Sequence, residues 1–202
     1  MERVGIMGGT FNPPHIGHFI IAETVRQEMS LDKIIFIPTG RIGYKDASNV
    51  ASAEDRCCML NLVIRENPAF ELSDIEIKNS KNYSYTANTL LALKDIDKNR
   101  DYYFIVGADS LDYMDDWYKP EIIFSNCRVV CANRPGISAL RLKSKKEKLE
   151  REFGADITFV DIPQVGISSS LIRNRVAEGK SIKYLTDARI EEYILLNGLY
   201  RS

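Results

Sequence analysis

The stretch RVGIMGGTFNPPHIGHFIIAETVRQEM, Arg3 to Met29, contains a strand pattern, a short loop and a helix pattern. RVGIMG is an apolar run of strand length, and HFIIAETVRQEM carries its apolar residues at helical spacing. Between them, Gly8 and Gly9 let the main chain leave the strand in conformations that a side chain would forbid. The stretch therefore predicts the first strand, loop and helix of an α/β protein.

The same alternation continues along the chain. Further strand patterns are KIIFIPT, FELSDIEI, YYFIVGA, CRVVCA and ITFVDI, and the helix patterns are AEDRCCMLNLVIRE, YTANTLLALKDID, PEIIFSN and ALRLKSKKEKLEREF. Two final helix patterns, SSLIRNRVAEG and DARIEEYILLNG, end in Gly179 and Gly198. Alternation of this kind predicts an open parallel sheet with helices on both faces, followed by a C-terminal helical segment. Because no linker or repeat interrupts it, we expect residues 1–202 to form a single domain.

Composition argues against several classes of protein. A formal net charge of -1 gives no broad electrostatic reason to bind nucleic acid or an anionic membrane. No apolar run approaches the roughly 20 residues that a membrane span needs, and the first residues do not resemble a signal peptide, so we expect a cytoplasmic protein. The four cysteines include no CxxC pair and are expected to be reduced, mostly buried thiols rather than zinc ligands.

Both histidines of the chain, His15 and His18, lie at the start of the first helix pattern. Their spacing puts both rings on one helix face, and Gly17 between them is expected to leave room for a ligand. The amino end of a helix favours negative charge, and in open α/β sheets ligands bind beyond the carboxyl ends of the strands. The arrangement favours binding of a phosphate chain. The alternative is a helix cap with two incidental surface histidines.

A second segment, GISSSLIRNR, has the pattern of a phosphate-binding helix start. Ser168, Ser169 and Ser170 form an N-cap cluster with free amides and hydroxyls, and Arg173 lies one turn inside the helix. Together they can bind the terminal phosphates of a triphosphate, although the segment considered alone is an ordinary capped helix. GxGxxG and GxxxxGK[ST] loops are absent, which disfavours hydride transfer and kinase chemistry. The string HIGH resembles class I aminoacyl-tRNA synthetases, but no KMSKS-like segment accompanies it.

Taken together, GGTFNPPHIGH and ISSSLIR resemble the nucleotidylyltransferase superfamily, and most closely the bacterial nicotinate-nucleotide adenylyltransferases. These enzymes join nicotinate mononucleotide to the AMP part of ATP. Segments similar to that family follow in order: PTGRIGYK, ASAEDRCCML, YSYTANTL, YFIVGADS, DDWYKPEII, ANRPG and KYLTDARIEEYILLNGLY. The resemblance spans almost the whole chain and implies a Rossmann-like fold, with direct in-line attack of the mononucleotide phosphate on the α-phosphate of ATP.

The resemblance also assigns residues to ATP. The phosphates would be held by four basic residues, His15, His18, Lys45 and Arg173. The rest of the ATP site would comprise small, polar or loop residues, namely Gly8, Gly9, Thr10, Phe11, Gly107, Asp109, Ser168, Ser169 and Ser170. A Mg²⁺ ion carried mainly by the phosphate oxygens would bridge the triphosphate, so no set of metal-binding side chains is expected. Asp109 would accept the ribose hydroxyls; otherwise it is a simple helix cap.

On the acceptor side, the resemblance implies four residues. Trp117, the only tryptophan, would stack on the pyridine ring, unless it is a partly buried core aromatic. Thr86 and Tyr118 would present main-chain amides to the nicotinate carboxylate, and Arg134 would add positive charge. ATP and nicotinate mononucleotide are thus the expected partners, together with a possible homo-oligomer.

Departures from the family pattern raise two further expectations. Asn12 stands where the family commonly has Asp, and we expect activity to survive. RIGYK keeps Lys45 but has Tyr44 in place of a histidine. Gly40 and Gly43, which flank Arg41 and Ile42, predict a mobile loop that closes over bound nucleotide. The basic run RLKSKKEKLER is expected to be a solvated helix face.

Two other functions stay open: a phosphopantetheine adenylyltransferase-like enzyme, and a non-catalytic dinucleotide sensor.

Overall fold

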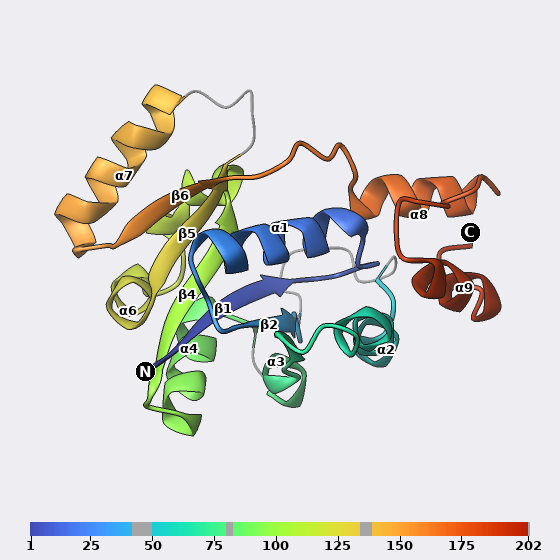
Figure 1. Cartoon of the computed structure of the whole chain (residues 1–202), viewed down its shortest axis with the longest axis horizontal. Coiled ribbons are helices and arrows are strands. Elements are labelled where there is room, and N and C mark those ends of the chain that lie inside the picture. The colour runs from blue at the N-terminus through green and yellow to red at the C-terminus, as the bar shows by residue number, and fades with distance from the viewer. Residues whose placement is uncertain (42–49, 80–82, 134–138, 202) are drawn as a thin grey trace. The chain divides into compact units, whose positions relative to one another are not determined.

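Six strands form one sheet in a computed structural model of the chain, which describes residues 1–41, 50–79, 83–133 and 139–201. The strand order is β3-β2-β1-β4-β5-β6, and the pairs β1–β4, β4–β5 and β5–β6 are parallel. This is the strand order of a Rossmann sheet, in which β2 and β3 are added on one side of β1 and β4 to β6 on the other. The strands are β1 (Glu2–Gly9), β2 (Lys33–Pro38), β3 (Phe70–Leu72), β4 (Arg100–Gly107), β5 (Arg128–Asn133) and β6 (Ile157–Asp161) (Figure 1). The predicted α/β class with an open parallel sheet is confirmed.

Helices connect the strands where the helix patterns predict them. They are α1 (Ile16–Glu28), α2 (Ala53–Ile64), α3 (Ile75–Lys78), α4 (Thr86–Ile96), α5 (Ala108–Leu111), the 3₁₀ turn η2 (Met114–Asp116), α6 (Pro120–Asn126), α7 (Ala139–Phe153), α8 (Ser169–Ala177) and α9 (Ala188–Leu196). Gly179 and Gly198 follow the last two helices with φ of 67° and 61°, the left-handed conformation predicted for them. Asp187 caps α9 by accepting a hydrogen bond from the Arg189 amide.

The strand predicted over FELSDIEI is wrong in its second half. The strand stops at Leu72, and Ile75–Lys78 form one helical turn in which the Lys78 amide donates to the Asp74 carbonyl, 2.9 Å away. Ile75 and Ile77 alternate with charged residues, which is a strand pattern, but four residues are too few to distinguish the two periods. α5 and η2 were likewise not anticipated, because each is only three or four residues long.

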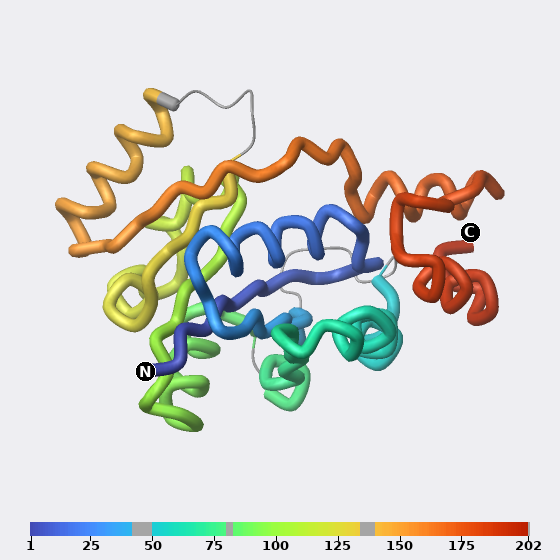
Figure 2. Tube along the Cα trace, viewed as in Figure 1, coloured from blue at the N-terminus to red at the C-terminus, as the bar shows by residue number. Residues whose placement is uncertain are grey.

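The chain divides into two compact units. Unit 1 comprises Met1–Met7, Ile21–Ile35 and Tyr85–Gln164, and unit 2 comprises Gly8–Ile20, Phe36–Ser84 and Val165–Ser202. In unit 2, α8 and α9 lie side by side near the C-terminus and share an apolar core with Met59 of α2 (Figures 1 and 2). The loop after β1 with His15, the first turn of α1 with His18, and the serine-rich start of α8 therefore belong to one unit.

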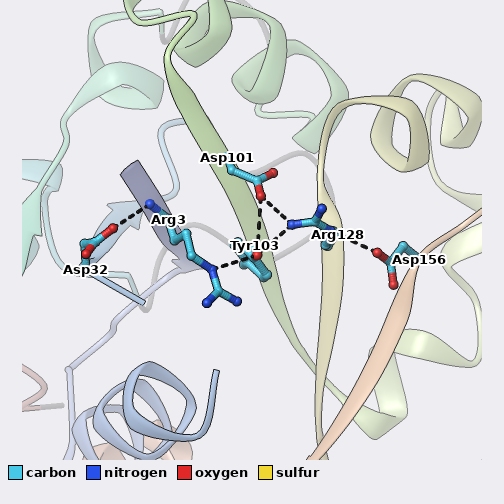
Figure 3. A network of polar contacts seen from close by, with 6 residues as sticks. All are labelled: Arg3, Asp32, Asp101, Tyr103, Arg128 and Asp156. Atoms are coloured by element: carbon cyan, nitrogen blue, oxygen red, sulfur yellow. Dashed lines mark hydrogen bonds and ion pairs between the residues drawn. The ribbon is translucent and has the colours of Figure 1, made fainter. Parts of the chain in front are cut away.

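In unit 1, a polar network links the amino ends of neighbouring strands (Figure 3). Its members are Arg3, Asp32, Asp101, Tyr103, Arg128 and Asp156. The Tyr103 hydroxyl accepts hydrogen bonds from Arg3 Nε at 3.0 Å and Arg128 Nη1 at 2.6 Å, and it donates to Asp101. Because ligands of parallel sheets bind at the carboxyl ends of strands, we interpret this network as structural.

The cysteines are free thiols, as expected. Cys127 and Cys131 are buried, and burial raises the pKa of each to about 12, so both stay protonated. Cys57 and Cys58 are half-buried on α2. Over the described parts of the chain, no helix combines the length and the apolar character that crossing a membrane would require.

Candidate functional site

The loop between β1 and α1 is packed around a buried aromatic ring. Phe11 has a φ of 49° and is 2% exposed, with its ring edge-to-face against His18 at 5.0 Å and 5.9 Å from that of Phe36. A side chain at Gly9 would place its Cβ 3.2 Å from the Phe11 ring, so the glycine makes room for that ring. Of the residues predicted to contact ATP, Phe11 therefore points its side chain into the core and leaves only its main chain for a ligand.

Carbonyl oxygens of this loop accept hydrogen bonds from side chains elsewhere in unit 2. The donor–acceptor pairs are Arg56–Thr10 (3.0 Å), Arg173–Asn12 (2.8 Å), Ser169–Pro13 (2.8 Å) and Thr186–Pro14 (2.9 Å). A carbonyl oxygen repels an anion, so tying these oxygens to protein donors removes that repulsion from the loop. The sequence alone indicated neither Arg56 nor Thr186 as a partner of the loop.

Asn12 is the most connected residue of the loop. Its side chain is buried, and Oδ1 accepts hydrogen bonds from the Ala51 amide at 3.0 Å and the Tyr200 hydroxyl at 2.8 Å. Burial raises the pKa of Tyr200, which keeps the hydroxyl protonated and able to donate. Asn12 therefore joins the segment just before α2 and the C-terminal residues to the loop.

Replacing Asn12 separates this structural role from its charge. Asn12→Leu leaves two partly buried donors, the Ala51 amide and the Tyr200 hydroxyl, without this acceptor, and we expect the free energy of unfolding to fall by about 2 kcal/mol. Asn12→Asp offers a carboxylate oxygen that can accept both bonds, so it should lose much less. Urea unfolding at neutral pH, followed by circular dichroism, measures both variants. A leucine variant as stable as the parent would show that Asn12 does not hold the loop.

His15 and His18 are stacked, with ring centroids 3.7 Å apart and an interplanar angle of 25°. The His15 amide donates to His18 Nδ1 at 3.1 Å, and the His18 amide donates to the His15 carbonyl at 2.9 Å. The bond from the His15 amide is one half of a capping box, with an imidazole where Glu or Gln usually stands, while the bond from the His18 amide to the His15 carbonyl is a main-chain turn. Because Nδ1 accepts, the proton of the neutral His18 ring is on Nε2, which is therefore the donor of this ring.

Gly17 has a different role from the expected one. A Cβ there would lie 3.0 Å from His15 Nδ1 and 3.1 Å from Cε1, so the His15 ring occupies the space that was expected to hold a ligand. His15 is 6% exposed, whereas His18 is half-buried. Of the two imidazoles, His18 is thus the more accessible to a ligand.

The serine hydroxyls at the start of α8 are not free, contrary to expectation. Ser168 accepts from the Leu171 amide at 3.1 Å, Ser169 donates to the loop, and Ser170 accepts from Arg173 Nη2 at 3.2 Å. Three short side chains at a helix start compete for local partners, and here each has one. What α8 offers to an anion is then the amides of Ser169 and Ser170 in its first turn and the Arg173 guanidinium.

Gly107, Asp109, Thr86, Trp117 and Tyr118 lie in unit 1. Gly107 ends β4 and Asp109 stands in the first turn of α5, and both are exposed. Thr86 opens α4, whose N-cap residue Tyr85 gives no side-chain hydrogen bond to the helix. The first-turn amides of α4 are therefore not capped by that side chain.

Two neighbouring aromatic residues of unit 1 differ in their surroundings. Trp117 is half-buried and lies edge-to-face with Phe104 at 6.1 Å, so it has a core contact without being enclosed. Tyr118 is exposed, and its ring lies 4.5 Å from that of Tyr85. Each thus keeps surface to which a planar ligand has access.

Predictions for Tyr44, Lys45 and Arg134 fall outside the described residues. Just before the residues that are not described, Gly40 approaches α3 so closely that a Cβ would lie 2.1 Å from the Glu76 carbonyl oxygen. The glycine is therefore required by packing against α3. Next to it, the Arg41 guanidinium lies over the Tyr83 ring, 4.7 Å from its centroid.

Comparison with known proteins identifies the chain. The model of the Cytidylyltransferase-like family matches residues 6–175. A relative from Desulfitobacterium hafniense (strain Y51) named "Probable nicotinate-nucleotide adenylyltransferase" is 40% identical over 99% of this chain and 96% of its own length. One of the same name from Lachnoclostridium phytofermentans is 38% identical over 99% of this chain and 100% of its own length. The chain belongs to the nicotinate-nucleotide adenylyltransferase family.

Solved structures of the same fold agree with this family. Plasmodium falciparum nicotinic acid mononucleotide adenylyltransferase complexed with NaAD is 18% identical, with a TM-score of 0.81 over 99% of this chain and 98% of that one. The same enzyme complexed with APC gives a TM-score of 0.79 over the same shares of both chains, also at 18% identity. These structures confirm the Rossmann-like fold, and the relatives at 38–40% identity confirm the resemblance seen in the sequence and the nucleotidyltransferase class.

In this nicotinate-nucleotide adenylyltransferase, the groups around the loop after β1 suit phosphate rather than a metal ion. They are the imidazole of His18 in α1, the guanidinium of Arg173 in α8 and the amides at the start of α8, all of which are donors that bind oxyanions. Across the described ranges, no three His, Cys, Asp or Glu side chains come together as possible metal ligands. A Mg²⁺ ion that arrives on ATP, held by phosphate oxygens and water, is compatible with this donor set.

Proposed function

We propose that this enzyme joins nicotinate mononucleotide to the AMP part of ATP, giving nicotinate adenine dinucleotide and pyrophosphate in NAD biosynthesis. Its curated relatives carry the name of this activity, and a solved structure of the same fold holds NaAD. The observation in this chain that carries the proposal is the stacked His15–His18 pair beside the loop after β1, in which Nδ1 of the half-buried His18 ring accepts from the His15 amide and Nε2 is the ring's donor.

In the proposed reaction, a phosphate oxygen of nicotinate mononucleotide forms a bond to the α-phosphorus of ATP. The bond from that phosphorus to the bridging oxygen breaks, and its electron pair leaves with pyrophosphate. No covalent bond to the enzyme is formed. Catalysis then consists of holding the two phosphates in line and offsetting the negative charge that grows on the leaving group.

Four basic residues would supply this positive charge. His18 Nε2 and the His15 ring would donate to the α-phosphate and to the leaving oxygens, while Lys45 and Arg173 would hold the far end of the triphosphate. Arg173 already donates to the Asn12 carbonyl at 2.8 Å, which keeps its guanidinium beside the loop. Mg²⁺ would arrive with ATP and add positive charge to the departing pyrophosphate.

The remaining ATP contacts would be made by main chain and small polar groups. We assign to them Gly8, Gly9, Thr10, Phe11, Gly107, Asp109, Ser168, Ser169 and Ser170. Phe11 would act through its main chain, since its ring is buried. The three serines would act through the amides at the start of α8, because their hydroxyls already have protein partners.

The acceptor would be recognised by residues of unit 1 and by Arg134. Trp117 would stack on the pyridine ring, and its partial exposure supports this role. Amides of Thr86 and Tyr118 would bind the nicotinate carboxylate. The absence of a side-chain cap from Tyr85 supports the Thr86 assignment, because that helix start then has amides to offer.

We also propose that both units belong to a single nucleotidylyltransferase domain. The bounds of β1, α1 and β2 support this, since each runs from one unit into the other. A cytoplasmic location fits an enzyme that consumes ATP and a mononucleotide. Neither nucleic acid nor a membrane is among its proposed partners.

Release of pyrophosphate tests the proposed function. Purified enzyme is incubated with Mg-ATP and either nicotinate mononucleotide or phosphopantetheine, with an acceptor-free sample as control. We expect release with nicotinate mononucleotide only. Pyrophosphate release with phosphopantetheine alone would identify a phosphopantetheine adenylyltransferase-like enzyme. Binding of dinucleotide without any pyrophosphate release would identify a sensor. Either result contradicts the proposal.

A further inference from the structure

The segment before Trp117 is fixed on two sides. It runs from α5 through η2, and its apolar residues Leu111 and Met114 are both 0% exposed in the core of unit 1. The Trp117 amide donates to the Met114 carbonyl at 3.2 Å, so Trp117 closes the η2 turn. Any displacement of η2 would therefore move the main chain of Trp117.

The other side of this segment is held by one face of α7. Arg141, Lys145 and Lys148 are spaced four and three residues apart, which places them on the same helix face. Lys145 and Lys148 each bind one carboxylate oxygen of Asp115 in η2, the latter at 2.8 Å, and Arg141 binds Asp112 at 2.7 Å. The basic run was expected to be a solvated face, and in this respect that expectation is wrong.

Burial makes the Asp115 contacts stronger than ordinary surface ion pairs. The side chains of Asp115 and Lys145 are 14% and 13% exposed, whereas Lys148 is 44% exposed. Because the charges of Asp115 and Lys145 are largely shielded from solvent, water and salt weaken their attraction less. The ion pair with Lys145 is therefore the main restraint on η2. The hydrogen bonds from Lys145 and Lys148 lower the pKa of Asp115 to about 2, and the carboxylate is ionised at every practical assay pH.

We propose that Lys145 and Lys148 are positioning residues for the acceptor nucleotide: through Asp115 they hold η2 and so set the place of Trp117. Neither lysine touches a substrate in this account. The inference rests on the proposed function in one respect, the stacking of Trp117 on the pyridine ring. A helix far along the chain thus determines how well the acceptor binds, without contributing to the chemical step.

Single substitutions on α7 test the proposal with a matched control. Lys145→Ala removes the main restraint, and Lys148→Ala removes the weaker one at a site exposed enough to preserve folding. Lys145→Arg keeps a charged donor and should restore most of the effect. Lys143→Ala makes the same change of charge at an exposed position of the same helix, where no effect is expected.

Two measurements report on position rather than on overall stability. Because Trp117 is the only tryptophan, its fluorescence reports this segment alone; Lys145→Ala should shift emission to longer wavelength and increase quenching by acrylamide. The KM for nicotinate mononucleotide should rise about 3- to 30-fold, with kcat and the KM for ATP within about twofold. Lys148→Ala should produce the same changes at smaller size.

The outcomes separate the proposal from the function on which it rests. Unchanged Trp117 emission in both alanine variants, or an unchanged KM for nicotinate mononucleotide in Lys145→Ala, overturns the positioning role. Equal effects from Lys143→Ala also overturn it, since they would reflect net charge. A parent enzyme that releases no pyrophosphate refutes the proposed function instead, and Trp117 emission then still decides whether the lysines position that residue.

Discussion

His18→Ala is expected to lower kcat for adenylyl transfer about 10²- to 10³-fold, because it removes a preorganised donor to the developing charge on phosphate. The substitution also removes the acceptor of the His15 amide, which costs about 1 kcal/mol, as for other helix caps. The fold should therefore survive. Steady-state kinetics with saturating Mg-ATP and nicotinate mononucleotide measure the loss, with circular dichroism as the check on folding.

A second variant separates the cap from the chemistry. His18→Glu can still accept the His15 amide, since Glu is a usual partner in a capping box, but its carboxylate repels phosphate. We expect this variant to fold at least as well as His18→Ala and to be no more active. If His18→Glu restored turnover to within a few-fold of the parent, His18 would act only as a cap and its phosphate role would be wrong.

The second large effect concerns the choice of acceptor. Nicotinate and nicotinamide mononucleotides differ only in carboxylate against carboxamide. Amides at Thr86 and Tyr118 would satisfy both carboxylate oxygens, whereas a carboxamide NH₂ would face them with its own donors and leave groups unpaired, at about 1 to 3 kcal/mol each. Two such mismatches favour the acid by about 10² or more. We expect kcat/KM to be at least about tenfold higher for nicotinate mononucleotide.

Trp117→Ala is the control for this preference. Stacking serves both pyridine rings alike, so the variant should weaken both acceptors comparably and leave their ratio almost unchanged. Specificity constants are measured for both acceptors with parent and variant. Equal constants in the parent would mean that no carboxylate site of this kind exists. A ratio that collapses in the variant would move discrimination from the amides to Trp117.

Local patterns in the sequence predict most of the secondary structure, because strand and helix periods depend on near neighbours. The stacking of His15 and His18 follows from their spacing, and the left-handed glycines after α8 and α9 follow from their position. The exception is the region of FELSDIEI, where a single helical turn is too short to show its period. Short elements depend on their surroundings, which a local pattern does not contain.

Contacts between distant residues are what the sequence does not predict. The Asn12 side chain has partners 39 and 188 residues away, and nothing in GGTFNPPHIGH indicates them. The prediction that the basic face of α7 is solvated is wrong for the same reason. Its pattern fits ion pairs within the helix, such as Lys146 with Glu150, but Lys145 pairs with Asp115 in an earlier segment. Lys145 has no acidic residue three or four positions away in α7, so its partner lies elsewhere, and only the packing of unit 1 determines that this partner is Asp115.

The most direct test of direct adenylyl transfer follows the α-phosphorus itself. ATP labelled at that position is mixed with the enzyme and nicotinate mononucleotide, and the label is traced among nucleotide, protein and product. We predict label in nicotinate adenine dinucleotide, in amounts equal to the pyrophosphate released, with none bound to the protein. Label attached to the protein during turnover, or pyrophosphate released without labelled dinucleotide, would contradict in-line attack by the mononucleotide phosphate.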